Sequence, residues 1–277
     1  MLTAITRAVS PAIADCLLTY MDRDPIDAHK AATQHEAYCA LLKELGVEVV
    51  RLPADSDCPD SVFVEDNAVV ADEVAVLARM HDPAREPEVD RIAEVIGGYR
   101  PLERIEAPGT LEGGDVIRVG RTFFVGLSSR TNADGAQQLK TLLEPRGYTV
   151  RTVPVTGCLH LSTGASHVGD GLMLVNPKWV DASAFTRSED PALRVLNVPD
   201  DEPWAANTML VRDTVVMPAG FPKTRAMLER HDRAVREVDI SELMKAEAGL
   251  TCMRKLFEAD TAAARKLAEA QAPVARA

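Results

Sequence analysis

The stretch Gly249-Leu250-Thr251-Cys252-Met253 carries the last of five polar residues that recur along the chain 45 to 48 residues apart. The five residues are Asp66, Glu112, His160, Asn207 and Cys252. A steady period in the forties is typical of supersecondary units that repeat around an axis or along a stack. If the units surround an axis, the same point of each unit faces the centre. The sequence then predicts that a thiol, an imidazole and two carboxylates meet there, which is the minimum equipment for nucleophilic catalysis.

Helical and strand patterns alternate between these residues. Apolar side chains follow helical spacing over 28–45, and Gly46 ends this helix before a strand over 47–52. The pattern returns where Asn132 caps a helix and a strand follows over 148–153. Each period holds two or three strands and one helix, which predicts an α/β fold. Weaker helical copies and the short apolar strands between them occupy 87–98, 222–240, 68–71, 74–77, 116–119, 122–125, 172–175, 209–211 and 214–217.

The composition is that of an ordinary globular protein, with 277 residues of which 46% are hydrophobic and 26% charged. The net charge of −11 argues against a nucleic-acid-binding surface. The charge is compatible with a small cationic substrate, although an acidic surface is more often only an aid to solubility. No apolar run is long enough to span a bilayer, so we expect no membrane partner.

Cysteine usage indicates a reducing compartment. The chain has five cysteines, which is an odd number, and they are widely spaced and form no CxxC pair. This pattern excludes a disulfide framework and a zinc ribbon. The first residues lack the basic and long apolar regions of a signal peptide. We therefore expect free thiols and a cytoplasmic protein.

No domain linker interrupts the repeats, so residues 1–257 are predicted to form a single catalytic domain. Residues 258–277 are rich in alanine and charge, which predicts a surface helix followed by a frayed tail. Residues 16–30 include the charged run Asp22-Arg23-Asp24 and are a candidate mobile flap, or equally an ordinary surface loop. No glycine-rich loop precedes a helix, which argues against nucleotide binding.

Each candidate catalytic residue also has an ordinary structural explanation. A lone cysteine such as Cys252 is most often a small buried hydrophobe. His160, between apolar neighbours, would by itself be a satisfied structural histidine. Glu112 and Asp66 belong to acidic pairs of a kind that often only caps turns. Their shared period and complementary chemical roles favour the catalytic interpretation.

Several motifs, in order and spacing, resemble those of dimethylarginine dimethylaminohydrolases. This family belongs to the guanidine-modifying superfamily, together with arginine deiminases and amidinotransferases. The resemblance covers roughly residues 12–257 and implies the pentein fold, a five-bladed pseudo-fivefold α/β propeller of ββαβ-type repeats with its active site on the axis. The matching stretches are Asp60-Ser61-Val62-Phe63-Val64-Glu65-Asp66, Thr110-Leu111-Glu112-Gly113-Gly114-Asp115, Ser129-Arg130-Thr131-Asn132, Leu159-His160-Leu161, Ala205-Ala206-Asn207 and Leu250-Thr251-Cys252.

The resemblance implies a hydrolase acting on a free guanidino amino acid, above all an Nω-methylated arginine. Cys252 would supply the attacking thiolate, and His160 would protonate the departing amine and then activate a water molecule. Glu112 would orient His160, and Asp66, helped by Glu65, would hold the guanidinium NH groups. The products would be citrulline and methylamine or dimethylamine. No cofactor and no metal is expected, although the thiol and the imidazole could attract an inhibitory metal ion.

The amino-acid end of the substrate needs other groups. By the same resemblance, Arg85 and Arg130 would bind the α-carboxylate, for which the arginine fork is well shaped. From the sequence alone, both arginines are as readily solvated surface residues. Asp60 and the backbone carbonyls of Leu17 and Ala246 would lie near the α-amine.

The chain departs from the family pattern at a few positions. Ser162 stands where a lysine is common, Arg254 stands where a small residue is usual, and Glu247-Ala248-Gly249 replaces a stretch that often reads Asp-Gly-Gly. These departures bear on the exact substrate more than on the type of reaction.

Three alternatives remain open from the sequence. An arginine deiminase would release ammonia, although that family typically carries an added helical domain that this chain lacks. An amidinotransferase would replace water by an amine. A non-catalytic propeller could bind arginine derivatives without using a nucleophile. The resemblance is compatible with a monomer or a homodimer, and it leaves the preference among dimethylarginine, monomethylarginine and arginine undecided.

Overall fold

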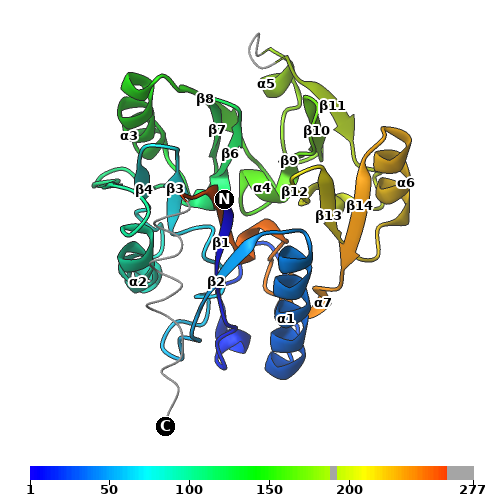
Figure 1. Ribbon diagram of the computed structural model, residues 1–277, viewed down its shortest axis with the longest axis horizontal. Helices are drawn as coiled ribbons and strands as arrows, with labels where there is room; N and C mark the ends of the chain where they lie inside the picture. The colour runs from blue at the N-terminus through cyan, green and yellow to red at the C-terminus, as the bar shows by residue number, and fades with distance from the viewer. Residues whose placement is uncertain (188–191, 261–277) are drawn as a thin grey trace.

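Five small sheets surround a central axis in the computed structural model, which describes residues 1–187 and 192–260 (Figure 1). Each sheet has three strands, and its middle strand pairs antiparallel with one neighbour and parallel with the other. The sheets are β15 (Lys255–Glu258), β1 (Leu2–Arg7) and β2 (Glu48–Leu52); β3 (Ala68–Val70), β4 (Ala75–Leu77) and β5 (Leu102–Arg104); β6 (Val116–Val119), β7 (Thr122–Leu127) and β8 (Thr149–Pro154); β9 (Ala165–His167), β10 (Leu172–Val175) and β11 (Arg194–Asn197); β12 (Met209–Val211), β13 (Thr214–Pro218) and β14 (Ala234–Val238).

A helix joins the second and third strands of each unit, because a parallel pair cannot be closed by a tight turn. Figure 1 shows the longer of these helices at the rim of the molecule, outside the sheets. The five connecting helices are α1 (Ala28–Glu44), α2 (Glu86–Ile96), α3 (Ala133–Leu143), α5 (Ser183–Thr186) and α6 (Pro222–Arg230). Two further helices of one turn each, α4 (Leu161–Gly164) and α7 (Ser241–Met244), lie in connections between one unit and the next.

Local sequence explains where the main helices begin and end. The Asp27 side chain caps α1 by accepting the N–H groups of His29 and Lys30. Gly46, two residues beyond the end of α1, adopts a φ of +77°, which a residue with a side chain rarely takes. Asn132 caps α3 by accepting the N–H of Gly135. The helix and strand predicted over 28–52 and the cap predicted at Asn132 are therefore confirmed.

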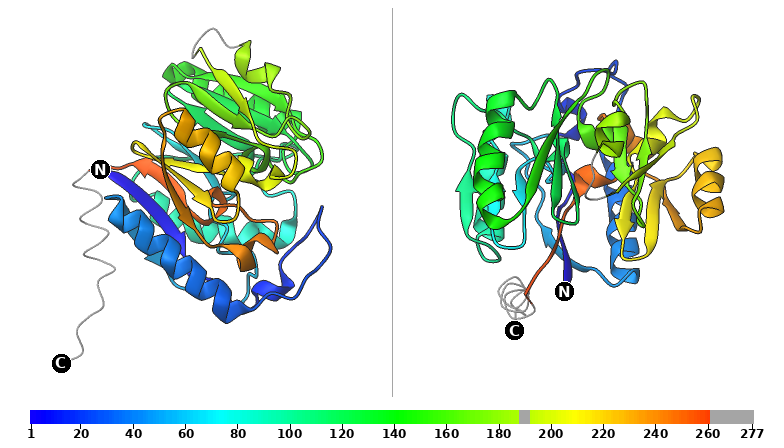
Figure 2. Two further views of the ribbon diagram at one scale, coloured as in Figure 1. Left: turned by 90° about the vertical axis from the view of Figure 1, so that its right-hand side faces the viewer. Right: turned by 90° about the horizontal axis from the view of Figure 1, so that it is seen from above.

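The first sheet is built from both ends of the chain. Strand β15 pairs antiparallel with β1 in a register that runs from Leu2 opposite Glu258 to Ile5 opposite Lys255. The N-terminal ammonium also donates to the Ala259 carbonyl at 2.7 Å. Figure 2 shows β1 and β15 side by side with α1 next to them. This pairing closes the ring.

The core is divided among the units. Five apolar clusters fill the spaces between sheets and helices, and each draws on neighbouring units. In one of them, Val69 of β3 and Val76 of β4 lie with Phe123 of β7 and Leu139 of α3, all buried. Packing a helix between two sheets fixes the angle between neighbouring units. This holds the first strands of the units around the axis.

The predicted arrangement of five repeated α/β units around an axis is confirmed. The sequence patterns did not predict the short strands β5, β9 and β11. They also did not predict β1 and β15, the two strands that close the ring. Glu258, the first residue of the predicted tail, is the last residue of β15, and residues 261–277 lie outside the described residues. None of the described helices is both long and apolar enough to cross a membrane.

Candidate active site

The five periodic residues occupy equivalent places in the fold. Each of them lies two to five residues before the first strand of a sheet, with Asp66 before β3 and Cys252 before β15. Glu112 and His160 precede β6 and β9, and Asn207 precedes β12. All five are buried, with at most 6% of each residue exposed. The repeat therefore brings residues that are far apart in sequence to one end of the axis.

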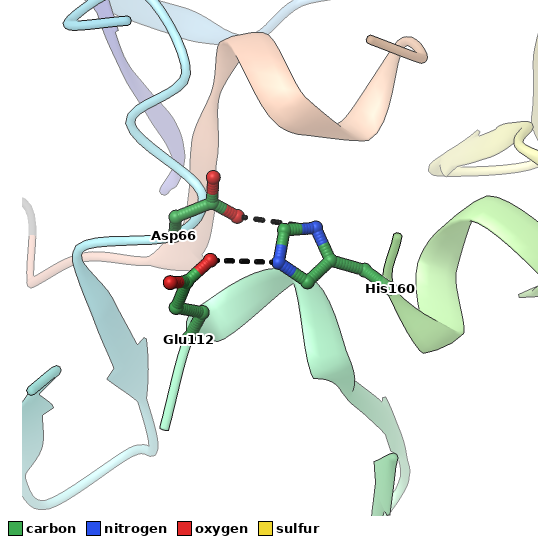
Figure 3. A group of neighbouring side chains, drawn as sticks. All are labelled: Asp66, Glu112 and His160. Carbon is green, nitrogen blue, oxygen red and sulfur yellow. Dashed lines mark hydrogen bonds and ion pairs between the residues drawn. The ribbon is translucent and has the colours of Figure 1, made fainter. Parts of the chain in front are cut away.

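His160 lies between two carboxylates, as Figure 3 shows. Its Nε2 is 2.8 Å from Glu112 Oε2 and its Nδ1 is 3.7 Å from Asp66 Oδ1. Burial alone would lower the pKa of His160, but Asp66, Glu112 and Asp115 outweigh burial and raise this pKa to about 9. Burial alone would raise the pKa of Glu112, and the hydrogen bond from His160 instead holds it low. The pair is therefore an imidazolium and a carboxylate at neutral pH, and His160 can donate a proton.

Cys252 lies in a single 3₁₀ turn, Thr251–Met253, next to Asn207. Its Sγ accepts the Gly249 N–H at 3.4 Å. Asn207 fixes Thr251, the residue before Cys252. The Asn207 amide donates to Thr251 Oγ1 at 3.0 Å and accepts the Thr251 N–H at 3.2 Å. Burial raises the pKa of the Cys252 thiol, and the negative charges of Glu65 and Asp66 raise it further. The empty site therefore holds a thiol, and an added positive charge would favour the thiolate.

A small cavity of about 20 Å³ adjoins the thiol and the imidazole, which is room for about one water molecule. All but two of the predicted site residues line this cavity. Glu112 lies just behind His160, and Glu65 faces elsewhere. The cavity is lined by Leu17, Asp60, Phe63, Asp66, Arg85, Arg130, Leu159, His160, Ala246, Glu247, Ala248 and Cys252.

Three buried polar atoms of this lining have no hydrogen-bond partner within the described parts of the chain. They are Asp66 Oδ1, Arg130 Nη1 and Glu247 Oε2. Burying a polar group without a partner is costly, so native proteins rarely do it without a reason. Two acceptors and one donor around one small cavity thus have no hydrogen-bond partner among the described residues. This pattern is expected of a binding site for a ligand with two cationic groups and one anionic group.

Arg85 is fully engaged on one side of the cavity. Its Nη1 donates to Asp66 Oδ2 at 2.9 Å, and its Nε and Nη2 form a fork with the Glu88 carboxylate at 3.0 and 2.9 Å. Arg85 therefore orients Asp66 in this structure, and it is not a solvated loop residue. Asp60, also in the lining, has its pKa raised to about 6, mainly by burial.

The loop from Cys16 to Asp27 covers the cavity and corresponds to most of the candidate flap, whose last three residues belong to α1. The Leu17 N–H donates to the Asp60 carboxylate at 3.2 and 3.3 Å. Glu247 Oε1 accepts the backbone N–H groups of three consecutive residues, Thr19, Tyr20 and Met21. The cavity of about 20 Å³ is smaller than an amino acid.

Glu65 does not take the place expected for it beside the guanidinium. Its Oε1 accepts from Arg254 Nη1 at 2.9 Å and its Oε2 accepts from Thr251 Oγ1 at 2.7 Å. Glu65 lines a second cavity of about 340 Å³ on the axis, which Cys252 does not line. Glu65 and Asp66 belong to the turn over 64–67, just before β3, and within this turn only Asp66 lines the cavity beside Cys252.

A metal ion is a poor match for the cluster in Figure 3. Asp66, Glu112 and His160 each offer one atom within 4.8 Å of the others, as a metal site requires. However, His160 Nε2 is bound to Glu112, and the other oxygen of Asp66 is bound to Arg85. A metal would have to displace the hydrogen bond that orients the imidazole.

Sequence reasoning assigned no role to two buried carboxylates of the site, Glu247 and Asp115. Glu247 attracted notice only as a departure from the family pattern, and Asp115 only as the end of an acidic motif. Both accept backbone N–H groups that are far away in sequence, and backbone groups leave no trace in a sequence pattern.

Comparison with known proteins agrees with this geometry. The family model described as "N,N dimethylarginine dimethylhydrolase, eukaryotic" matches residues 20–189. The chain is 38% identical to the N(G),N(G)-dimethylarginine dimethylaminohydrolase of Pseudomonas aeruginosa over 233 residues, which are 83% of this chain and 90% of that one. It is 36% identical to the Streptomyces coelicolor protein of the same name, over 92% of this chain and 98% of that one.

Solved structures give the same result. The Pseudomonas aeruginosa enzyme, as a cysteine-to-serine variant in complex with citrulline, superposes with a TM-score of 0.85 at 35% identity, covering 92% of this chain and 98% of that one. The N-terminal domain of the cyanobacterial arginine dihydrolase ArgZ superposes with a TM-score of 0.82 at 20% identity, covering 92% of this chain and 98% of that domain, and shows a likeness of fold alone.

Proposed function

The chain belongs to the dimethylarginine dimethylaminohydrolase family and has its pentein fold, and we propose that it hydrolyses Nω-methylated arginine to citrulline and methylamine or dimethylamine. The substrate is a free amino acid with a guanidinium, an α-ammonium and an α-carboxylate. In this proposal Cys252 is the nucleophile, His160 the general acid and base, and Glu112 the group that orients His160.

The observation that carries the proposal is the set of three buried atoms around the thiol that have no hydrogen-bond partner within the described residues. Asp66 Oδ1 is the acceptor for the guanidinium, and Arg130 Nη1 is the donor for the α-carboxylate. Glu247 Oε2 is an acceptor for the α-ammonium, together with Asp60 and the carbonyls of Leu17 and Ala246. A guanidino amino acid satisfies all three atoms, whereas a simple alkylguanidine satisfies only the first.

The first half of the reaction forms a covalent intermediate. The bound guanidinium adds a positive charge beside Cys252, which lowers the thiol pKa, and the thiol proton passes to solvent. The thiolate attacks the guanidinium carbon, and His160 gives its proton to the departing nitrogen, so that dimethylamine or methylamine leaves. A positively charged thiouronium then remains on Cys252, and His160 is neutral.

The second half consumes water. Neutral His160 takes a proton from a water molecule, which attacks the same carbon, and collapse of this adduct expels the Cys252 thiolate and forms the ureido group of citrulline. Glu112 stabilises the imidazolium at both stages through its 2.8 Å hydrogen bond. Asp66, oriented by Arg85, keeps the carbon in place throughout.

The setting of the protein belongs to the same proposal. The cover formed by residues 16–27 opens to admit substrate and closes through the Glu247 contacts. The five free thiols suit a reducing cytoplasm, where the enzyme takes part in arginine metabolism as a monomer or a homodimer. The chemistry requires no cofactor, because the thiol and the imidazole supply the nucleophile and the proton transfers.

Product analysis tests the proposal. Purified protein is given asymmetric dimethylarginine, monomethylarginine and arginine separately, with Cys252→Ala as the control, and citrulline and released amine are measured. We expect citrulline from the methylated substrates and none from the variant. Citrulline from arginine alone, with ammonia, would indicate a deiminase. Tight binding of methylarginine without turnover would indicate the non-catalytic alternative.

A further inference from the structure

Asp115 ends the motif Glu112-Gly113-Gly114-Asp115, and the proposed chemistry gives it no part. The residue is fully buried at the end of the short 3₁₀ turn Gly113–Asp115. Its carboxylate lies between the segment that carries His160 and the loop over 128–131 that carries Arg130. A buried carboxylate in such a place calls for a reason, because its burial is costly unless several donors converge on it.

One carboxylate oxygen fixes the catalytic histidine. Asp115 Oδ1 accepts the backbone N–H of Leu161, the residue after His160, at 2.9 Å. The imidazole also lies close to the backbone of the motif, because a Cβ on Gly114 would be 2.7 Å from His160 Nδ1. Asp115 therefore holds the backbone from which the imidazole projects, and glycine at 114 leaves room for the ring.

The other oxygen fixes the loop of the carboxylate-binding arginine. Asp115 Oδ2 accepts from the Ser128 hydroxyl at 2.6 Å. Ser128 Oγ in turn accepts the N–H groups of Arg130 at 2.9 Å and Thr131 at 3.2 Å. Thr131 Oγ1 in turn accepts the Glu112 N–H at 3.1 Å. The loop is thus anchored to the same side chain as the histidine.

We propose that Asp115 is a positioning residue that fixes the position of Arg130 relative to His160. Binding of the α-carboxylate to Arg130 then aligns the reacting carbon with the catalytic imidazole. An ionised carboxylate only accepts hydrogen bonds, which suits the two donors that converge on it, the Leu161 N–H and the Ser128 hydroxyl. A longer side chain would not fit, since the carboxylate lies so close to Gly126 that a Cβ there would be 2.7 Å from Asp115 Oδ1. The kinetic part of this inference rests on the proposed function.

Two variants separate the contact of Asp115 with the His160 segment from its contact with the Arg130 loop. Asp115→Asn keeps the shape, but its NH₂ group cannot accept from Ser128, and the negative charge near His160 is lost. We expect kcat/KM to fall by roughly 10- to 100-fold, as for other residues that orient a catalytic group. Ser128→Ala leaves the Leu161 contact intact, so we expect KM to rise by about tenfold with kcat nearly unchanged. Asp134→Asn, at an exposed position of α3, is the matched control.

A shortened substrate tests the link itself. Decarboxylated dimethylarginine lacks the group that Arg130 binds, and wild-type kcat/KM for it should be far below that for the complete substrate. In Asp115→Asn, the ratio of kcat/KM for the complete substrate to kcat/KM for the shortened one should be about tenfold smaller than in wild type. The reason is that Arg130 is no longer held in place relative to His160. An unchanged ratio in a folded variant would overturn the coupling.

Two readouts need no turnover, and so they test the anchor even if the proposed function fails. The His160 pKa, from ¹⁵N NMR titration of the imidazole, should fall in Asp115→Asn and stay unchanged in Ser128→Ala. Amide hydrogen exchange at Arg130 and Thr131 should quicken in both variants and not in the control. Wild-type protection of these amides together with an unshifted His160 pKa in Asp115→Asn would refute the role. Absence of citrulline from the wild type would count against the proposed function alone.

Discussion

Replacing Glu247 by glutamine tests how the site recognises an amino acid. Glu247 Oε1 accepts three backbone N–H groups of the cover, whereas Oε2 is buried in the cavity lining without a partner. In Glu247→Gln the amide oxygen can keep the cover contacts, and the NH₂ group then faces the substrate's ammonium. Glu247 has a φ of +58°, and glutamine there bears the same backbone strain, so the change is electrostatic.

The size of the effect follows from the contact that is lost. A hydrogen bond between charged groups contributes about 1.5–3 kcal/mol, and each 1.36 kcal/mol is tenfold in rate. We therefore expect kcat/KM for dimethylarginine to fall by roughly 10- to 150-fold, mainly through KM. A deaminated analogue that keeps the guanidinium and the carboxylate should be turned over equally by variant and wild type, within about threefold.

The assay is citrulline formation, or formation of the matching ureido acid, at several concentrations of each substrate. Glu247→Ala is the matched comparison, because it also removes the cover contacts and should quicken amide exchange over 19–21, which Glu247→Gln should not. An equal loss of activity with the complete and the deaminated substrate would refute the assignment of Glu247 Oε2 to the ammonium.

Three further predictions concern charge and stability. The pKa of His160 is raised in the folded protein from 6.5 to about 9, so its contribution to stability is complete below pH 6.5 and is lost as the pH rises through 9. In urea unfolding, the stability of wild type relative to His160→Gln should therefore decrease over this window by about 3 kcal/mol. Arg254→Met leaves the buried Glu65 carboxylate without its ion pair and should lower the free energy of unfolding by about 3 kcal/mol. The double variant with Glu65→Gln should recover most of this loss. Equal losses in the single and the double variant would contradict the pairing. Asn207→Ala removes two hydrogen bonds to Thr251. It should lower kcat by roughly 10- to 100-fold with KM unchanged, because it disturbs the nucleophile and not the binding groups. A rise in KM alone would contradict the assignment of Asn207 to the nucleophile.

The period in the sequence predicted the centre of the site because the fold uses the same point of each unit. Asp66, Glu112, His160 and Cys252 all lie just before a first strand, so an interval along the chain became a position on the axis. The same reasoning cannot tell on which side of the axis a side chain points. Glu65 and Asp66 are adjacent in sequence, but only Asp66 lines the cavity beside Cys252.

Other features depend on contacts that no local pattern records. The first sheet joins the two ends of the chain, so neither β1 nor β15 has its neighbour nearby in the sequence. The contact between Glu247 and Thr19 spans 228 residues and involves a backbone donor, which any residue except proline could supply. Arg85 looked like a loop residue because its partner Asp66 is 19 residues away in sequence and comes within reach only in the folded protein.

The covalent intermediate on Cys252 is the central claim, and mass spectrometry tests it most directly. His160→Gly retains the nucleophile but lacks the group that activates water, so an intermediate formed from S-methyl-L-thiocitrulline, whose methanethiol leaves without an acid, should accumulate. We predict a stoichiometric adduct that maps to the peptide containing Cys252 and that is absent in the double variant with Cys252→Ala. An adduct on Cys158 or another cysteine, or no adduct in a variant that still binds the analogue, would contradict the account.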